Sequence, residues 1–223
     1  MKKALFISVH PDDETLGCGG TMFKLAEEGW DIGWLCLTDV FSGMGWDDKF
    51  IAARKEQIVK IQEFFGISDY KNLGIPTTTV GEKPLKHLIS DIFGFIQEFK
   101  PDWVFLPNRT DVHSDHRAGF EAAYSACKSF RAPFISKVFM YECLSETEYA
   151  PPFADSSFIP NVFIDITPFL ERKIHAMEIY ESEVKPAPFP RSNLVIEAHA
   201  RYRGSRMGVH FAEAFSLLFE AIR

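Results

Sequence analysis

Two short polar segments hold the residue types that bind metal ions and move protons. Residues 10–14 read HPDDE, and residues 113–116 read HSDH. Imidazole nitrogens and carboxylate oxygens are common protein ligands of catalytic zinc, and three such ligands leave one position open for water. Two imidazoles and one carboxylate drawn from these segments, such as His10, Asp13 and His116, would form a site of that kind. The pattern therefore predicts a mononuclear metal site that activates water.

Each of these residues has an ordinary structural explanation when it is taken alone. A single histidine at a strand end usually makes hydrogen bonds, and aspartates favour turns and helix starts. Asp12 and Asp13 are adjacent and cannot easily bind one ion together, so one carboxylate is left to act on the water. His113 and His116 lie three residues apart and can face one ion from the first turn of a helix. Four ligands would close the site, and we therefore expect one of these two histidines to contact substrate instead.

The pattern of apolar residues indicates how the two segments are brought together. Residues 4–9 form a continuous apolar run, which is typical of a strand buried on both faces of a parallel sheet. Predicted strands also cover residues 31–37, 70–73 and 103–106, and predicted helices cover residues 21–28, 48–65, 85–99 and the stretch from the HSDH segment to about 129. This alternation predicts an open, mostly parallel sheet, in which sites form beyond the carboxyl ends of the strands. Both histidine segments follow predicted strands.

Three glycines, Gly17, Gly19 and Gly20, lie between the HPDDE segment and the predicted helix 21–28. They do not have the G-x-G-x-x-G spacing of a dinucleotide-binding turn, and the acidic residues before them would repel a pyrophosphate. We therefore interpret them as a turn in which the backbone approaches closely beside the metal-binding residues.

The last third of the chain gives weaker patterns. Residues 137–142 and 161–166 are predicted strands, residues 168–180 a helix with a proline near its start, and residues 211–222 a closing helix. Residues 185–208, which are rich in proline and arginine, are interpreted as a long ordered loop or lid. The elements together predict a Rossmann-like α/β fold, with an open, mostly parallel sheet flanked by helices and an irregular C-terminal third. No linker-like stretch divides the sequence, so we expect one domain over residues 1–223.

The composition excludes several classes of protein. The chain has 223 residues, of which 46% are hydrophobic and 25% charged, as in ordinary globular proteins. Its formal net charge of −7, without a basic stripe, removes the attraction that dominates nucleic-acid binding. No apolar run reaches the ~18 residues of a membrane span, and the short apolar start does not fit a signal peptide. The 4 cysteines form no C-x-x-C pair, so we interpret them as reduced and expect a cytoplasmic protein.

The two histidine segments resemble the two signatures of the zinc-dependent PIG-L/LmbE-like de-N-acetylases. The likeness extends over most of the chain. It includes a second stretch that contains Arg54 and ends at Gly66, the KPD sequence at 100–102, and the FAEAF run at 211–215, which is similar to the terminal motif of sugar-deacetylating members. The chain departs from the family pattern at residues 77–79, where three threonines follow GIP and many members carry an acidic residue. That departure concerns how the far side of the sugar is held.

The resemblance implies a role for each residue of the two segments. His10, Asp13 and His116 would bind Zn²⁺, Asp12 would act as general base on the metal-bound water, and a protonated His113 would face the oxyanion. The departing amine would take its proton from either Asp12 or His113. The implied reaction is removal of the N-acetyl group from an N-acetylglucosamine-type compound, such as a sugar conjugate or a nucleotide sugar. Similar proteins often assemble as homo-oligomers.

Four further charged residues have two readings each. Asp115 either caps the helix that follows the HSDH segment or orients His113 and keeps its pKa high. Arg54, Arg109 and Arg203 suit sugar hydroxyls or a phosphate, but arginines are mostly surface residues. Only Arg54 gains support as a substrate-binding residue from the family pattern.

The residues leave two other functions open. Two histidines and a carboxylate also form the metal site of non-haem Fe(II) oxygenases, although the usual β-barrel scaffold of those enzymes does not match the predicted helices. A binding module that retains a metal ion without turnover is the second alternative, but it would not need a base such as Asp12 beside the water. The same ligands also accept Fe(II) or Co(II) in place of zinc. We expect a small amino-sugar substrate, no nucleic-acid partner and no membrane insertion.

Overall fold

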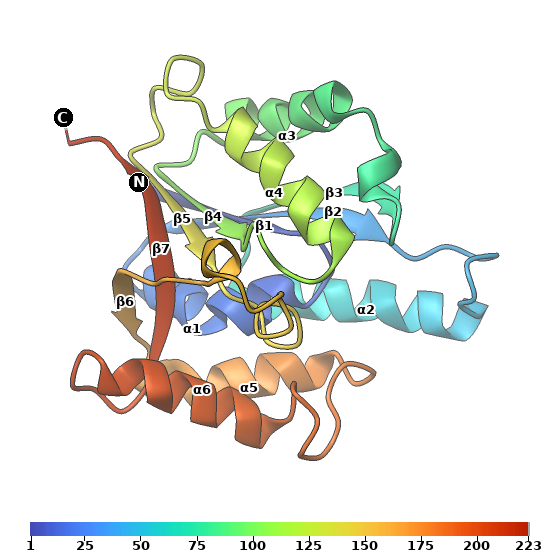
Figure 1. Cartoon of the computed structure of the whole chain (residues 1–223). Coiled ribbons are helices and arrows are strands. Elements are labelled where there is room, and N and C mark those ends of the chain that lie inside the picture. Colours follow the sequence, from blue (N-terminus) through green and yellow to red (C-terminus); the bar gives the residue numbers. More distant parts are fainter. Residues whose placement is uncertain (223) are drawn as a thin grey trace.

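The structure, a computed structural model, describes residues 1–222 and is built around a seven-stranded mixed sheet (Figure 1). The strands in chain order are β1 (Lys3–Ser8), β2 (Asp31–Asp39), β3 (Asp69–Pro76), β4 (Trp103–Pro107), β5 (Lys137–Tyr141), β6 (Val162–Asp165) and β7 (Ala212–Glu220). Their order across the sheet is β3-β2-β1-β4-β5-β7-β6. The strands β1 to β5 pair in parallel, whereas β7 pairs antiparallel with both β5 and β6. The predicted open, mostly parallel sheet is therefore confirmed.

Helices cover both faces of the sheet (Figure 1). They are α1 (Asp13–Glu27), α2 (Asp48–Phe65), α3 (Leu85–Phe99), α4 (Ser114–Ala126), α5 (Leu170–Ile179) and α6 (Asn193–Ser205), with 3₁₀ turns at Val80–Glu82, Ala154–Ser156 and Thr167–Phe169. One apolar core, which includes Phe6 and Phe105, lies on the α1 and α2 side, and a second, which includes Ile7 and Leu106, lies on the α3 and α4 side. Because successive strand residues face opposite sides, burial on both faces explains the continuous apolar run at residues 4–9.

The strand order changes direction between β1 and β4. From β1 the chain proceeds outward through β2 to β3, and then returns to place β4 on the other side of β1. Such a reversal opens a crevice beyond the carboxyl ends of the two neighbouring strands, where open α/β sheets place their sites. The HPDDE segment follows β1 and the HSDH segment follows β4, so the fold brings both segments to this crevice.

The three glycines near the N-terminus lie inside α1, which begins at Asp13, so their interpretation as a turn before residue 21 is wrong. A Cβ atom on Gly17 would lie 2.2 Å from Cδ2 of Tyr141, and one on Gly20 would lie 2.6 Å from side-chain atoms of Ile166. The glycines therefore allow α1 to pack closely against β5 and the end of β6. The helix keeps its form there because tertiary packing outweighs the low helix propensity of glycine.

The middle of α1 is also tied to the C-terminal strand by a buried ion pair. Glu213 of β7 accepts hydrogen bonds from the backbone N–H groups of Gly20 and Thr21, at 2.9 and 2.8 Å. Lys173 of α5 donates to Glu213 at 2.6 Å and to the carbonyl oxygen of Leu16 at 2.7 Å. Glu213 and Lys173 are only 4% and 3% exposed. Hydrogen bonds to protein groups therefore take the place of the hydrogen bonds that the two charged groups would make to water.

Two predictions for the last third of the chain are wrong. Residues 211–222 do not form a closing helix, because Ala212–Glu220 is strand β7, inserted between β5 and β6. A short apolar run fits a helix or a buried strand equally well. Here the pairing with β5 on one side and β6 on the other determines that a strand forms. Residues 185–208 are not all loop, because α6 begins after Ser192, whose side chain accepts from the N–H of Val195.

Among residues 1–222 no helix is long and apolar enough to cross a bilayer.

Candidate metal centre

The two histidine segments meet at the crevice between β1 and β4. His10 lies just after β1, Asp13 is the first residue of α1, and His116 lies in the first turn of α4. The ring centroids of His10 and His116 are 5.3 Å apart. The sequence placed these residues at neighbouring strand ends, and the structure brings them into contact.

Three atoms form a triangle of potential ligands. His116 Nε2 lies 3.3 Å from His10 Nδ1 and 3.3 Å from Asp13 Oδ2, and His10 Nδ1 lies 3.9 Å from Asp13 Oδ2. Ligand atoms placed about 2.0–2.1 Å from a tetrahedral zinc ion are about 3.3 Å from one another. Two sides of the triangle match that spacing and the third is slightly longer. The donor set therefore fits one small divalent cation with its fourth position open.

The backbone holds Asp13 in place. Its Oδ2 atom accepts hydrogen bonds from the N–H groups of Val9 and His10, at 2.9 and 2.8 Å. Burial opposes ionisation of this carboxyl, but His116 and His10 outweigh burial and hold the pKa of Asp13 below its usual value. Asp13 is therefore a preformed carboxylate, which is the state that binds a cation.

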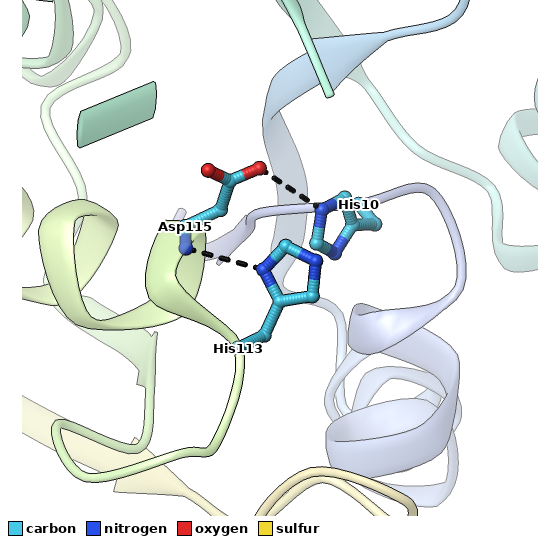
Figure 2. Close-up of side chains that lie close together, drawn as sticks. All are labelled: His10, His113 and Asp115. Atoms are coloured by element: carbon cyan, nitrogen blue, oxygen red, sulfur yellow. Dashed lines mark hydrogen bonds and ion pairs between the residues drawn. The ribbon is translucent and has the colours of Figure 1, made fainter. Parts of the chain in front are cut away.

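Each of the two imidazoles has a carboxylate on the side away from the triangle. His116 Nδ1 lies 2.8 Å from Oδ2 of Asp111, and both residues are fully buried. His10 Nε2 lies 3.4 Å from Oδ2 of Asp115 (Figure 2). A carboxylate in this position fixes the ring and the tautomer of a metal-binding histidine. The 2.8 Å contact favours a proton on His116 Nδ1, which leaves Nε2 free to donate its lone pair. His10 Nε2 makes no hydrogen bond, and the nearby Asp115 carboxylate favours a proton there by its charge.

Asp111 was missed by the sequence analysis. Its Oδ1 atom accepts hydrogen bonds from the side chains of Asn108 and Thr147, at 2.8 and 2.6 Å, so both oxygens of the carboxylate are used. The sequence contains a signal for this role. A metal-binding imidazole generally donates its other ring N–H to a carboxylate or carbonyl, and Asp111 is the nearest acidic residue before the HSDH segment.

His113 caps helix α4 and presents a single proton. Its Nδ1 atom accepts a hydrogen bond from the backbone N–H of Asp115 at 3.1 Å (Figure 2), which places the ring proton on Nε2. Burial, with the neighbouring His10 and His116, lowers the pKa of His113 to about 4. Both effects favour a neutral imidazole that donates through its Nε2–H over the expected protonated form.

Asp115 also differs from its expected role. Its carboxylate accepts from the N–H groups of Thr78 and Val80, at 2.6 and 3.1 Å, and faces His10 rather than His113. It does not cap α4, and its charge raises the pKa of His113 by less than burial and the neighbouring histidines lower it. Asp115 contacts His113 through its backbone N–H. Its side chain instead joins the loop after β3 to His10 of the candidate cation site.

A second group of potential ligands overlaps the first. This group consists of His10, His113 and Asp115, each of which has one potential ligand atom within 4.8 Å of those of the other two. Figure 2 shows the three side chains. A neutral imidazole has one free lone pair, so His10 cannot serve both groups at once. The lone pair of His113 Nδ1 is already used by the backbone N–H of Asp115, and the other ring nitrogen of His113 carries the proton. The triangle that contains Asp13 and His116 is the better cation site.

Asp12 lies beside the triangle with an unusual backbone conformation. Its φ angle is 143°, outside the regions that most side chains adopt, and its side chain is buried. Its Oδ2 atom lies 2.6 Å from Nη1 of Arg191. Burial raises the pKa of Asp12 to about 7 against the lowering effect of Arg191. A carboxyl with a pKa near neutrality can both accept and return a proton.

Arg54 forms part of the wall next to Asp12. Its Nη1 atom donates to the carbonyl oxygen of Pro11 at 2.9 Å, and its Nη2 atom pairs with Glu183 and with Ser182 Oγ. Its Nε atom is buried without a hydrogen-bond partner. The arginine therefore supports the HPDDE turn, and its expected contact with substrate stays a prediction.

The other two arginines singled out from the sequence lie elsewhere. Arg109 donates to the carbonyl oxygen of Asp155, and Arg203 binds both carboxylate oxygens of Glu142, at 2.7 and 2.6 Å. Neither residue lines the cavity at the triangle. Arg191, which lines the cavity together with Arg54, was missed because its proline-rich segment gives no pattern that would place it.

A cavity of about 180 Å³ opens over the triangle. Trp46, whose ring stacks on Phe50 at 4.5 Å between centroids, forms one wall, and Glu183 and Arg191 from the segment after α5 form another. The remaining lining residues are His10, Pro11, Asp12, Asp13, Leu16, Thr38, Asp39, Val40, Phe50, Arg54, Thr77, His113, Cys143, Ser145 and Glu146. The arrangement can hold a small polar substrate against a cation, a carboxyl and an imidazole N–H.

The chain is similar to a known protein family, to curated proteins and to solved structures. The family model described as PIG-L, GlcNAc-PI de-N-acetylase, matches residues 5–127. Diacetylchitobiose deacetylase of Thermococcus kodakarensis is 27% identical over 96% of this chain and 82% of its own length. A probable N-acetyl-α-D-glucosaminyl L-malate deacetylase of Bacillus cereus is 30% identical over 52% of this chain and 57% of its own length. The solved structure of the conserved protein TT1542 from Thermus thermophilus has a TM-score of 0.78 and 26% identity, covering 100% of this chain and 97% of that one.

Proposed function

Because the chain belongs to the PIG-L family of de-N-acetylases, we propose that it is a zinc-dependent hydrolase that removes the N-acetyl group from an N-acetylglucosamine-type substrate. The observation that carries the proposal is the triangle of His10, Asp13 and His116, with Asp12 and His113 beside it and a cavity above it. Relatives named as deacetylases of acetylated amino sugars support the substrate class. The seven-stranded sheet, which uses strands from both ends of the chain, supports one domain over residues 1–223.

The metal ion would be held by His10, Asp13 and His116. A divalent cation in that place supplies a Lewis acid that lowers the pKa of a water molecule toward ~7 and polarises the amide carbonyl. The residues around the site then need only position the substrate and transfer protons. Asp111 and Asp115 keep the two imidazoles in the ligand tautomer.

Asp12 would act as the general base. Asp12 lines the cavity, and Arg191 occupies its Oδ2 atom, whereas its Oδ1 atom makes no hydrogen bond with the described residues. Oδ1 would accept the proton of the attacking water as the oxygen bonds to the acetamide carbon. The same proton would pass to the nitrogen when the carbon–nitrogen bond breaks, so that a neutral amine and acetic acid leave, and the acid then releases its proton to solvent as acetate forms.

His113 would stabilise the negative charge that develops on the carbonyl oxygen. Its proton is fixed on Nε2 because Nδ1 accepts from the N–H of Asp115. A donor whose orientation is fixed before reaction costs no reorganisation, and one such donor is commonly worth on the order of 10²–10³ in rate. Neutral His113 suits this role, because it donates a hydrogen bond without competing with the cation for charge.

The experiment measures free amine released from N-acetylglucosamine, N,N′-diacetylchitobiose and N-acetylglucosamine conjugates. We expect release by the zinc-loaded protein, loss after chelation, and recovery when Zn²⁺ is restored. Asp12→Asn should lower kcat by about 10²–10⁴-fold, because it removes the base without changing the shape of the side chain. Asp155→Asn, a change at an exposed carboxylate outside the cavity, serves as control.

Two results would overturn the proposal. Absence of amine release from every substrate of the panel, with metal bound at one equivalent, would exclude the deacetylase function. Amine release that survives Asp12→Asn unchanged would exclude the role of Asp12. Oxygen consumption by the Fe(II)-loaded protein would instead favour an oxygenase.

A further inference from the structure

Both arginines of the cavity are already paired with carboxylates of the protein, whereas two cavity carboxylates have no cationic partner. From this arrangement we propose that the enzyme selects substrates in which the group attached to N-acetylglucosamine is neutral or cationic, and that it rejects anionic groups such as malate or phosphate. The proposal rests on the deacetylase function and specifies its substrate class.

The two arginines form ion pairs with carboxylates of the protein, and they share Glu183 as a partner. Arg191 Nη1 lies 2.6 Å from Asp12 and 3.0 Å from Glu183, and its Nε donates to Ser145 Oγ at 2.9 Å. Arg54 pairs with the other oxygen of the same Glu183 and with the carbonyl of Pro11. Their positive charge is therefore balanced before a substrate binds. No other lysine or arginine among residues 1–222 lines the cavity.

Glu146 is a cavity carboxylate without a partner. Its Oε2 atom is buried and makes no hydrogen bond, and no lysine, arginine or histidine of the described chain forms an ion pair with it. Burial and the nearby Asp13 and Asp111 raise its pKa, while His116 and Arg191 oppose that effect. An unpaired carboxylate of this kind is costly to keep beside a second anion.

Asp39 presents a second carboxylate without a cationic partner. It is the last residue of β2, and its Oδ1 atom accepts only from the N–H of the adjacent Val40, at 2.8 Å. Asp39 and Glu146, which lies in the segment after β5, reach the cavity from different parts of the chain.

A bound metal ion and His113 would hold the carbonyl oxygen of the acetamide, where negative charge develops. The group attached to the sugar would then meet a cavity wall that includes Asp39 and Glu146 and no arginine or lysine free of a protein carboxylate. Juxtaposed like charges oppose binding, most strongly in a partly desolvated site. Neutral and cationic groups avoid this repulsion, and an ammonium group gains a hydrogen-bond acceptor.

The test compares three conjugates in which an N-acetylglucosamine unit carries an attached group of different charge: N-acetylglucosaminyl glucosamine (cationic), diacetylchitobiose, whose attached group is a second N-acetylglucosamine (neutral), and N-acetylglucosaminyl malate (anionic). We expect kcat/KM for the anionic conjugate to be at least about tenfold below that of the neutral one. The difference should lie mainly in KM, because the charge is remote from the reacting carbonyl. It should shrink as ionic strength rises.

Two substitutions identify the carboxylates responsible. Glu146→Gln and Asp39→Asn, made singly and together, should reduce the ratio of neutral to anionic kcat/KM, to within about threefold in the double variant. Glu121→Gln, on the exposed face of α4, changes the net charge equally outside the cavity and should leave the ratio as in wild type. The ratio within each variant cancels any general loss of active protein.

The outcomes separate this inference from the proposed function. Hydrolysis of all three conjugates with equal kcat/KM, or preference for malate, overturns the charge selection and leaves the deacetylase intact. No hydrolysis of any conjugate overturns the deacetylase itself. A tenfold preference that persists in the double variant excludes Glu146 and Asp39 as its cause.

Discussion

The guanidinium of Arg191 lies 2.6 Å from the carboxylate of Asp12, although the two residues are 179 positions apart in the chain. Arg191 belongs to the segment between α5 and α6, which crosses beside the cavity and also contributes Glu183. This contact fixes one oxygen of the proposed base and leaves the other free. The geometry of the HPDDE segment thus depends on a part of the chain that contributes no residue to the triangle of His10, Asp13 and His116.

Replacing Arg191 should impair turnover more than substrate binding. In Arg191→Met the carboxylate of Asp12 loses its fixed orientation, and misplacement of a reacting group by about 1 Å can cost ~10²-fold in rate. We expect kcat to fall by about 10- to 100-fold with a smaller change in KM. Arg191→Lys keeps the charge and should retain more of the rate, and added guanidinium should restore part of it in Arg191→Met. Arg201→Met, at an exposed arginine on α6, is the control, and an unchanged kcat in Arg191→Met would contradict the prediction.

Removing the charge of Asp111 should weaken metal binding. Asp111→Asn keeps the shape of the side chain but no longer stabilises a proton on His116 Nδ1, at the 2.8 Å contact. Loss of such a carboxylate typically costs 10–100-fold in metal affinity. Competition of the protein with a chromophoric chelator for Zn²⁺ measures this without reference to activity. An affinity equal to that of wild type would show that the carboxylate does not tune His116.

Two glycine-to-alanine changes should have opposite effects on stability. Gly20→Ala forces a Cβ to within 2.6 Å of Ile166 and should lower the unfolding free energy by about 1–3 kcal/mol. Gly94→Ala lies in α3 with no atom near the new Cβ and should raise it by about 0.5–1 kcal/mol. Urea unfolding of both variants tests the pair. Similar effects of the two changes would mean that helix propensity, and not packing, controls the glycines of α1.

The stability of the protein should contain a contribution from Glu142 that disappears in acid. Burial opposes ionisation of this carboxyl, but His199 and Arg203 outweigh burial and lower its pKa below the ordinary value of 4.5. A carboxyl whose pKa is lower in the folded state stabilises the fold above pH 4.5, and this contribution is lost as the pH falls through the folded-state pKa. The difference in unfolding free energy between wild type and Glu142→Gln should therefore be largest near neutral pH and shrink below pH 4.5. A difference that is constant with pH would contradict this.

The parts predicted correctly from the sequence share a local signal. The run at residues 4–9 identified a strand buried on both faces, and the positions of His10 and His116 after neighbouring strands placed them at one crevice. The parts that failed depend on distant partners. Gly20 lies in a helix because Ile166 packs on it, and residues 212–220 form a strand because β5 and β6 leave a position between them. Arg191 and Asp111 act through contacts that no local pattern encodes.

The buried contact between Glu213 and the middle of α1 has a consequence for how the protein acquires its metal. The helix that begins at Asp13 receives two of its hydrogen-bond acceptors from a residue 193 positions later than Gly20. A nascent chain that still lacks the final strand exposes the same histidines and aspartates without the support that fixes them. Stable formation of the candidate cation site therefore requires the final strand, and a chain interrupted before Glu213 would hold these side chains less firmly.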